Sequence, residues 1–294
     1  MDLLAEFSMD IDINSSTDGA TAVELPTTKS ALKSSPRPLL TAIDYDPFVD
    51  GEILLTAPAT ESQQEIWVGV QIGDEANLAC ILSQSLRLIG KLDLHALQAA
   101  FQQLVMRHEA LRTTFSGDGT LLLIAKQIEF TTPIIDLANL SASERLAQIE
   151  LHQQQAISQL FDLQHGPLFS TKIIKLSGRE HLTILTTHHI ICDGWSFEIL
   201  LQDLAKIYMG LVKGINPDLE PVEYLSEYAL LEREKIDTLA TVETERYWLE
   251  KFANIPPVLD FPTDYPRPPL RTFNADLVSY TLPADLVRDL KKMY

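Results

Sequence analysis

Apolar residues recur along the chain with two different periods, and each period predicts a type of element. A spacing of three to four residues, typical of a helix with one buried face, runs through 63–70, from Asp93 to about His108, and from Phe197 to Met209. Alternating or continuous apolar runs, typical of strands, occupy the ranges 81–89, 111–115, 121–125, 169–176 and 182–187. Helices and strands therefore interleave. This order predicts an α/β lobe in which helices cover a mixed sheet.

Polar residues indicate where several of these elements begin and end. Asp93 precedes the second helix as its expected N-cap, and the buried stripe of that helix is Leu94, Leu97, Phe101, Leu104 and Val105. Ser141 and Glu144 have the spacing of a capping box and predict a helix that runs to about Leu160. Beyond Ser196 the pattern is mostly helical, with a break at Asn216-Pro217.

Residues 1–50 differ in composition from the rest of the chain. They hold nine acidic and three basic residues, many Ser and Thr, and four prolines. Such a segment cannot bury enough apolar surface to offset the entropy of ordering it, so we expect an acidic, flexible linker. Leu3, Leu4 and Phe7 form a short apolar start that could dock on a neighbour, although a fraying terminus is the simpler interpretation.

Charge and cysteine content exclude several classes of function. The 294 residues carry a net charge of −18, which is unfavourable for binding nucleic acid or an anionic membrane surface. We find neither an apolar run long enough to span a bilayer nor a secretory signal, so we expect a cytoplasmic protein. Cys80 and Cys192 form no CxxC motif and predict neither a zinc site nor a disulfide framework. Cys192 could act as a nucleophile, but we expect its side chain to be packed.

The strongest chemical signal is the pattern HHxxxDG at residues 188–194. It lies where the strand 182–187 ends and a helix follows, so His188 and His189 should point to opposite faces, one of them toward a cavity. Asp193-Gly194 supplies turn residues and a possible helix cap. An imidazole suits proton transfer near neutral pH, although a histidine pair at a strand end can also be purely structural. A metal site is disfavoured, because adjacent strand residues diverge and no further ligand follows at suitable spacing.

Arg107 and Arg112 flank the corner between the helix that ends near His108 and the strand that follows. A guanidinium group can pair with carboxylates and fix such a corner, so we expect both arginines to be structural. His108 is likewise expected to be a helix-end histidine and not a catalytic base.

Several of these motifs together resemble the condensation domains of nonribosomal peptide synthetases, a superfamily that also contains chloramphenicol-acetyltransferase-like enzymes. The resemblance covers residues 53 to about 294. It rests on HHxxxDG at 188–194, RHExLRTxF at 107–115, a weakened SxAQxRLW at 60–67 with Glu65 in place of Arg, a YxDYAxW-like segment at 224–231, and a YW…LPTDxPRP-like segment from Tyr247 to Pro268. It implies a chloramphenicol-acetyltransferase-like lobe, residues 51–236, with the second lobe only begun in residues 237–294.

The resemblance also implies a role for each residue of the HHxxxDG loop. His189 is the family's second histidine, which faces the tunnel where two thioester-tethered substrates meet, and it would accept or orient the proton of the attacking amine. Gly194 would allow close backbone approach and offer an amide to the developing oxyanion. Asp193 would hold the loop through a salt bridge, and His188 would serve the loop's architecture.

By this resemblance the chain forms an amide bond between an acyl or peptidyl thioester and an aminoacyl amine. Both substrates would arrive on the 4'-phosphopantetheine of partner carrier proteins, upstream and downstream, with an adenylation domain adjacent and no cofactor bound by the domain itself. The acidic linker would suit a junction in a hybrid polyketide-peptide synthetase. A heterocyclisation domain is disfavoured, because such domains replace the histidine pair with aspartates.

Two alternatives stay open. One is an acyltransferase that moves an acyl group from coenzyme A or a carrier to an alcohol or amine; the other is a carrier-binding remnant without catalysis. Because the later family motifs are absent, we expect a chain that is inactive by itself. The identities of the acyl donor and the amino acid are beyond the sequence.

Overall fold

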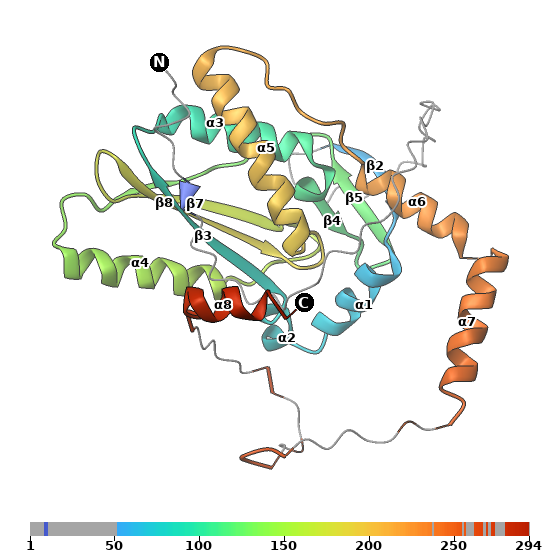
Figure 1. Cartoon of the computed structure of the whole chain (residues 1–294). Helices are drawn as coiled ribbons and strands as arrows, with labels where there is room; N and C mark the ends of the chain where they lie inside the picture. Colours follow the sequence, from blue (N-terminus) through green and yellow to red (C-terminus); the bar gives the residue numbers. More distant parts are fainter. Residues whose placement is uncertain are drawn as a thin grey trace. The chain divides into compact units, whose positions relative to one another are not determined.

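The computed structural model describes residues 9–10, 52–236, 238–254, 256, 262–266, 269, 272–273 and 280–293 (Figure 1). The chain divides into two units, residues 1–258 and 259–294, and each is described by itself. The helix described in the second unit is α8, Ala284–Leu290. The domain boundaries expected after residues 50 and 236 stay predictions. The interpretations of Leu3, Leu4 and Phe7, and of most of the linker, lie outside the described residues.

A five-stranded mixed sheet forms the centre of the first unit. Its strand order is β1-β3-β8-β7-β6, and only the β6–β7 pair is parallel. The strands are β1 Met9–Asp10, β3 Ile81–Ile89, β6 Ile134–Asp136, β7 Phe169–Lys175 and β8 Glu180–His188. In the β3–β8 ladder Ile81 lies opposite His188 and Ile89 opposite Glu180, so the histidine motif emerges beside the start of β3.

A second, antiparallel sheet has the order β2-β5-β4. It is formed by β2 Ile53–Pro58, β5 Leu121–Ala125 and β4 Thr113–Phe115. Four residues of β5, Leu122 to Ala125, are each at most 1% exposed. This sheet continues the apolar core at the end of α3 and so supports the corner that carries the arginines.

Helices pack on both faces of the larger sheet (Figure 1). Both faces need to be covered because the apolar side chains of its central strand point alternately to the two faces. Helices α3, Leu94–Arg107, and α5, Gly194–Lys213, share one core cluster with Leu185 of β8. The neighbouring residue Ile184 belongs to a second cluster on the opposite face, under α4, Ala142–Ile157. Adjacent residues of a strand point to opposite faces, so one apolar run supplies both cores.

The other helices of the first unit are α1 Glu61–Val70, α2 Asp74–Leu78, α6 Leu225–Lys235 and α7 Leu239–Lys251. Helix α1 begins with a capping box between Thr60 and Gln63, which satisfies two backbone groups of its first turn. Helix α7 buries none of its residues, and its Trp248 ring stacks on Phe252 at 5.8 Å.

Most predicted elements are confirmed, with one clear correction. The strand expected over 111–115 is wrong in its first half: residues Glu109–Arg112 form a 3-10 helix, η2, and β4 begins only at Thr113. The physical reason is tertiary: Glu109 is buried and accepts from Ser226, and Arg112 is buried and donates to the Ala125 carbonyl, so contacts with distant segments override the local strand pattern. The helix from Ser141 ends at Ile157, three residues early. The short elements β2, α2 and β6 were not predicted.

Candidate active site at the end of strand β8

The two histidines of HHxxxDG lie on opposite sides of the backbone, as the strand pattern predicted. His188 is the last residue of β8 and is completely buried. Its Nδ1 accepts a hydrogen bond from the Ile190 backbone N–H at 3.1 Å, so the neutral ring carries its proton on Nε2. Within the described part of the chain this Nε2 has no hydrogen-bond partner, and the ring meets the Phe161 ring edge-on at 6.5 Å.

Burial keeps His188 neutral. Loss of hydration, with a smaller effect from the neighbouring His189, lowers the pKa of His188 from 6.5 to about 4. A ring that cannot readily gain a proton and cannot reach solvent is poorly placed for acid–base chemistry at neutral pH. Its hydrogen bond to the loop backbone suits the architectural role predicted for it.

His189 is exposed to solvent, the opposite of His188. Its backbone N–H donates to the Cys80 carbonyl at 2.7 Å, which ties the loop to the residue just before β3. Among the described residues no hydrogen bond to the His189 ring is found. The backbone of His189 is therefore held while its ring is left exposed to solvent.

Gln63 supports the loop from a third direction. Its buried side-chain amide donates to the Ile190 carbonyl at 3.1 Å, while the same side chain completes the capping box of α1 with Thr60. The weakened motif at 60–67 contains this glutamine, and its Thr-x-x-Gln spacing was the signal that could have identified it. The supporting contact of Gln63 was not predicted.

Asp193 caps the helix that leaves the loop. Its Oδ1 accepts hydrogen bonds from the Ser196 backbone N–H at 2.8 Å and from the Ser196 hydroxyl at 2.6 Å. Partial burial would raise the pKa of Asp193, but the hydrogen bonds from Ser196 and the nearby His189 outweigh it and hold that pKa below its usual value. The possible cap is thus confirmed.

The salt bridge expected for Asp193 is not found within the described residues; hydrogen bonds at the start of α5 take its place. A side-chain oxygen already shared between a backbone amide and a hydroxyl has little need of a cation. Gly194 is the first residue of α5 and is exposed. The first amides of a helix have no partner within the helix, so the Gly194 N–H is a donor near the His189 segment.

Cys192 does not have the environment of a nucleophile. It is 3% exposed, and burial, assisted by Asp193, raises the pKa of its thiol to about 12. Reactive cysteines need a stabilised thiolate and access to substrate, and Cys192 has neither. The expectation of a packed side chain is confirmed.

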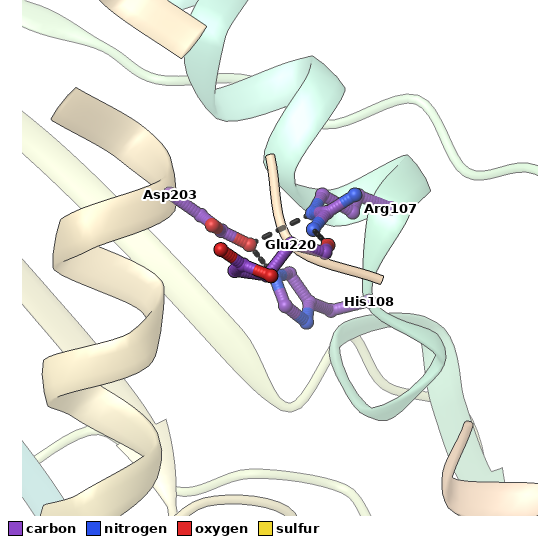
Figure 2. A network of polar contacts seen from close by, with 4 residues as sticks. All are labelled: Arg107, His108, Asp203 and Glu220. Atoms are coloured by element: carbon purple, nitrogen blue, oxygen red, sulfur yellow. Dashed lines mark hydrogen bonds and ion pairs between the residues drawn. The ribbon is translucent and has the colours of Figure 1, made fainter. Parts of the chain in front are cut away.

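The corner at residues 107–112 holds a network of polar contacts around the buried Asp203 (Figure 2). The Arg107 Nε donates to Oδ2 of Asp203 on α5 at 2.7 Å, and Nε2 of the His108 ring lies 2.9 Å from the same oxygen. Arg107 also donates to the Glu220 carbonyl, which lies beyond the end of α5. Burial lowers the pKa of His108 although Asp203 acts in the opposite direction, so the ring is neutral at pH 7 and donates its N–H.

Two further residues of the corner are directed inward. Oε2 of Glu109, which is 2% exposed, accepts from the Ser226 hydroxyl at 2.7 Å and so links η2 to α6. The buried Arg112 donates to the Ala125 carbonyl at the end of β5. The placement of Arg107 and Arg112 suits the structural role predicted for both. The buried contacts of Asp203 and Glu109 were not predicted. For Asp203 the sequence does give a signal, because it is an acidic residue on the apolar stripe of its helix.

A small cavity of about 130 Å³ separates the corner from the loop. It is lined by His108, Ala110, Leu111, Ile191, Cys192, Ser196, Ile199 and Leu200. In the described residues no group of three or more His, Cys, Asp or Glu side chains is arranged to hold a metal ion. None of the described helices is both long and apolar enough to span a bilayer.

The comparison of sequences identifies the family. The model of the condensation domain matches residues 54–294. One of the linear gramicidin synthase proteins of Brevibacillus parabrevis is 34% identical over 240 residues, which are 80% of this chain and 5% of that protein. Tyrocidine synthase 3, also of Brevibacillus parabrevis, is 34% identical over 239 residues, 80% of this chain and 4% of that protein. The chain thus spans a small share of the curated relatives that it matches.

Solved structures share the fold. The starter condensation domain of the rhizomide synthetase RzmA superposes with a TM-score of 0.60 at 23% identity, covering 70% of this chain and 51% of that chain. The EpoB NRPS cyclization-docking bidomain from Sorangium cellulosum gives a TM-score of 0.64 at 23% identity, covering 74% and 43%. The chloramphenicol-acetyltransferase-like fold expected from the motifs is confirmed, and the chain belongs to the condensation-domain family of nonribosomal peptide synthetases.

Proposed function

We propose that this chain supplies the HHxxxDG half of an active site that forms amide bonds in nonribosomal peptide synthesis. The observation that carries the proposal is the separation of the two histidines: His188 is buried, while His189 is exposed beside the start of α5. Membership of the condensation-domain family supports the assignment of the reaction.

In the proposed reaction an aminoacyl amine attacks the carbonyl carbon of an acyl or peptidyl thioester. His189 lies at the reacting centre and accepts or orients the proton of the attacking amine. The C–N bond forms, the tetrahedral intermediate collapses with loss of the C–S bond, and the leaving thiolate takes up a proton. The Gly194 N–H, at the positive end of α5, donates to the oxyanion of the intermediate.

The substrates in this proposal are tethered and already activated. Upstream and downstream carrier proteins present them on 4'-phosphopantetheine arms, and an adenylation domain of the same synthetase loads the amino acid. The domain binds no cofactor of its own and works in the cytoplasm, without nucleic acid or membrane. Tethering supplies the proximity that makes attack effectively unimolecular, so the protein has to align the amine and the thioester and handle one proton.

The test is amide formation in the synthetase that carries this chain, measured by intact mass of carrier proteins loaded with donor and acceptor. We expect His189→Ala to lower the rate at least about 100-fold, the scale of general acid–base catalysis. His165→Ala is the matched control, because His165 is also an exposed histidine, with its side chain 54% exposed. Its rate should equal that of the native protein.

A native rate in His189→Ala would contradict the catalytic role. Presenting the acyl donor on coenzyme A, in place of the carrier, separates peptide synthesis from the alternative acyltransfer reaction. Turnover only with the carrier-bound donor supports the proposal, and turnover only with coenzyme A supports the alternative.

A further inference from the structure

Helix α5 carries the loop at its N-terminus, and a cavity lies between that end and the corner. The 130 Å³ cavity lies between Ile191 and Cys192 of the loop and Ala110 and Leu111 of the corner. Atoms that line a cavity lose attractive contacts on one side, so the cavity does not fix the position of the loop. Phe197 and Leu200 pack the inner face of these first turns into the core, and a polar restraint further along α5 can add to the positioning of the loop.

Asp203 provides a polar restraint further along the helix. It is nine residues beyond Gly194, about 14 Å along the axis at 1.5 Å per residue, and is 6% exposed. One of its carboxylate oxygens accepts from both Arg107 and His108, which come from the end of α3 (Figure 2). Two donors from adjacent residues that converge on one oxygen restrict both the rotation and the sliding of α5 against α3.

His108 connects this restraint to the cavity. Its ring bonds Asp203 through Nε2, and His108 is one of the residues that line the cavity together with Ile191 and Cys192 of the loop. The carboxylate bond restricts the orientation of a ring that belongs to a cavity-lining residue. Arg107, which also bonds Asp203, donates in addition to the Glu220 carbonyl, beyond the other end of α5.

We propose that His108 and Asp203 are positioning residues that hold α5, and through it the segment from His189 to Gly194, in the geometry needed for reaction. The effect on activity rests on the proposed function, whereas the effect on the loop does not. Neither residue touches the reacting atoms in this proposal. Breaking their contact should loosen the first turns of α5 while the two sheets keep their structure.

Local hydrogen exchange, followed by mass spectrometry on the 294-residue chain, tests the structural half of the proposal. His108→Phe keeps an aromatic ring but removes the donor to Asp203, and His108→Gln keeps an N–H donor at the position of Nε2. We expect His108→Phe to raise exchange about 10-fold or more in peptides covering 190–200. His108→Gln should restore native protection there, and peptides from α4 should be unchanged in both variants.

Native protection of 190–200 in a folded His108→Phe protein would overturn the proposal, as would an equal rise in exchange throughout the chain. Asp203→Asn is the second variant. Its amide oxygen can still accept from Arg107 and His108, so we expect a smaller rise than for His108→Phe, and a larger one would also overturn the proposal.

Turnover in the synthetase completes the test. His108→Phe should lower kcat about 10-fold with the KM for the acceptor unchanged, and His108→Gln should recover kcat. If the native synthetase forms amide and His108→Phe matches it, the positioning role is wrong. If the native synthetase forms no amide, the proposed function fails, and the exchange result alone decides whether the contact between His108 and Asp203 holds the loop.

Discussion

The HHxxxDG loop at 188–194 and the corner at 107–112 contain similar residue types, but their side chains are placed in opposite ways. Each follows the end of a regular element, β8 for the loop and α3 for the corner. In the corner, Arg107, His108, Glu109 and Arg112 all bond groups inside the first unit. In the loop, His188 and Asp193 bond their own segment, and the His189 ring faces solvent.

The difference shows that residue type alone does not separate a buried histidine from an exposed one. The corner turns inward through a 3-10 helix, which buries Glu109 against the Ser226 hydroxyl and Arg112 against the Ala125 carbonyl. The loop leaves a strand, where neighbouring side chains must diverge, so one histidine is exposed when the other is buried. Substitutions in the corner should therefore change stability first, and His189 should affect activity first.

The largest effect on stability should come from the corner. Arg112→Met removes a buried donor to the Ala125 carbonyl, and we expect the free energy of unfolding to fall by about 3 kcal/mol. Arg87→Met is the control, because Arg87 pairs with Glu180 while its side chain is 52% exposed, and it should cost less than about 1 kcal/mol. Urea unfolding measures both. Equal losses in the free energy of unfolding would show that the buried Arg112 contact stabilises the protein no more than the exposed ion pair of Arg87.

Acid should weaken the first unit through its buried histidines. The pKa of His188 is lowered from 6.5 to about 4 by burial and His189, and those of His108 and His181 are also lowered, mainly by burial. Well above pH 6.5 each ring is neutral in both the folded and the unfolded state, so these histidines do not lower the stability. As the pH falls toward 4, the histidines of the unfolded chain become protonated while those of the folded chain stay neutral, so the free energy of unfolding decreases.

For His188 alone the decrease between pH 6.5 and pH 4.5 should be about 2 kcal/mol. Urea unfolding across this range measures it, and because glutamates titrate at its lower end, the native protein is compared with a variant that lacks this histidine. His188→Asn keeps an acceptor for the Ile190 N–H but does not titrate, so its stability should fall less steeply with acid. Identical slopes for the two proteins would contradict the neutral, buried His188.

The smallest effect should come from the cap of α5, and it distinguishes the cap from the salt bridge first expected. Asp193→Ala removes both hydrogen bonds to Ser196 and should cost about 1 kcal/mol. Asp193→Asn keeps an accepting oxygen and should stay within about 0.5 kcal/mol of the native protein. Thermal unfolding measures both variants. If the asparagine variant loses as much as the alanine variant, charge matters more than capping.

Local patterns predicted much of the fold. The apolar run at 81–89 matches β3, and Asp93 caps α3 by accepting from the Ala96 N–H. The divergence of His188 and His189 followed from the two-residue period of a strand. These predictions succeeded because each depends on backbone geometry within a few residues.

The failures depend on partners that are distant in sequence. Leu111 and Arg112 resemble the start of a strand, but Arg112 bonds a carbonyl thirteen residues away and both are buried. Gln63 lies 127 residues from Ile190, whose carbonyl it holds. The local sequence pattern around Arg112 or Gln63 does not indicate which carbonyl the side chain bonds.

The sequence by itself determined the family, the order of the main elements and the place of the HHxxxDG loop, because those follow from motifs and short-range periodicity. Only the tertiary structure decided which polar groups are satisfied inside the first unit and which histidine is left to solvent. Burial and hydrogen bonding depend on chain segments that meet in space, and the pairing of His108 and Arg107 with Asp203, about one hundred residues away, is an instance.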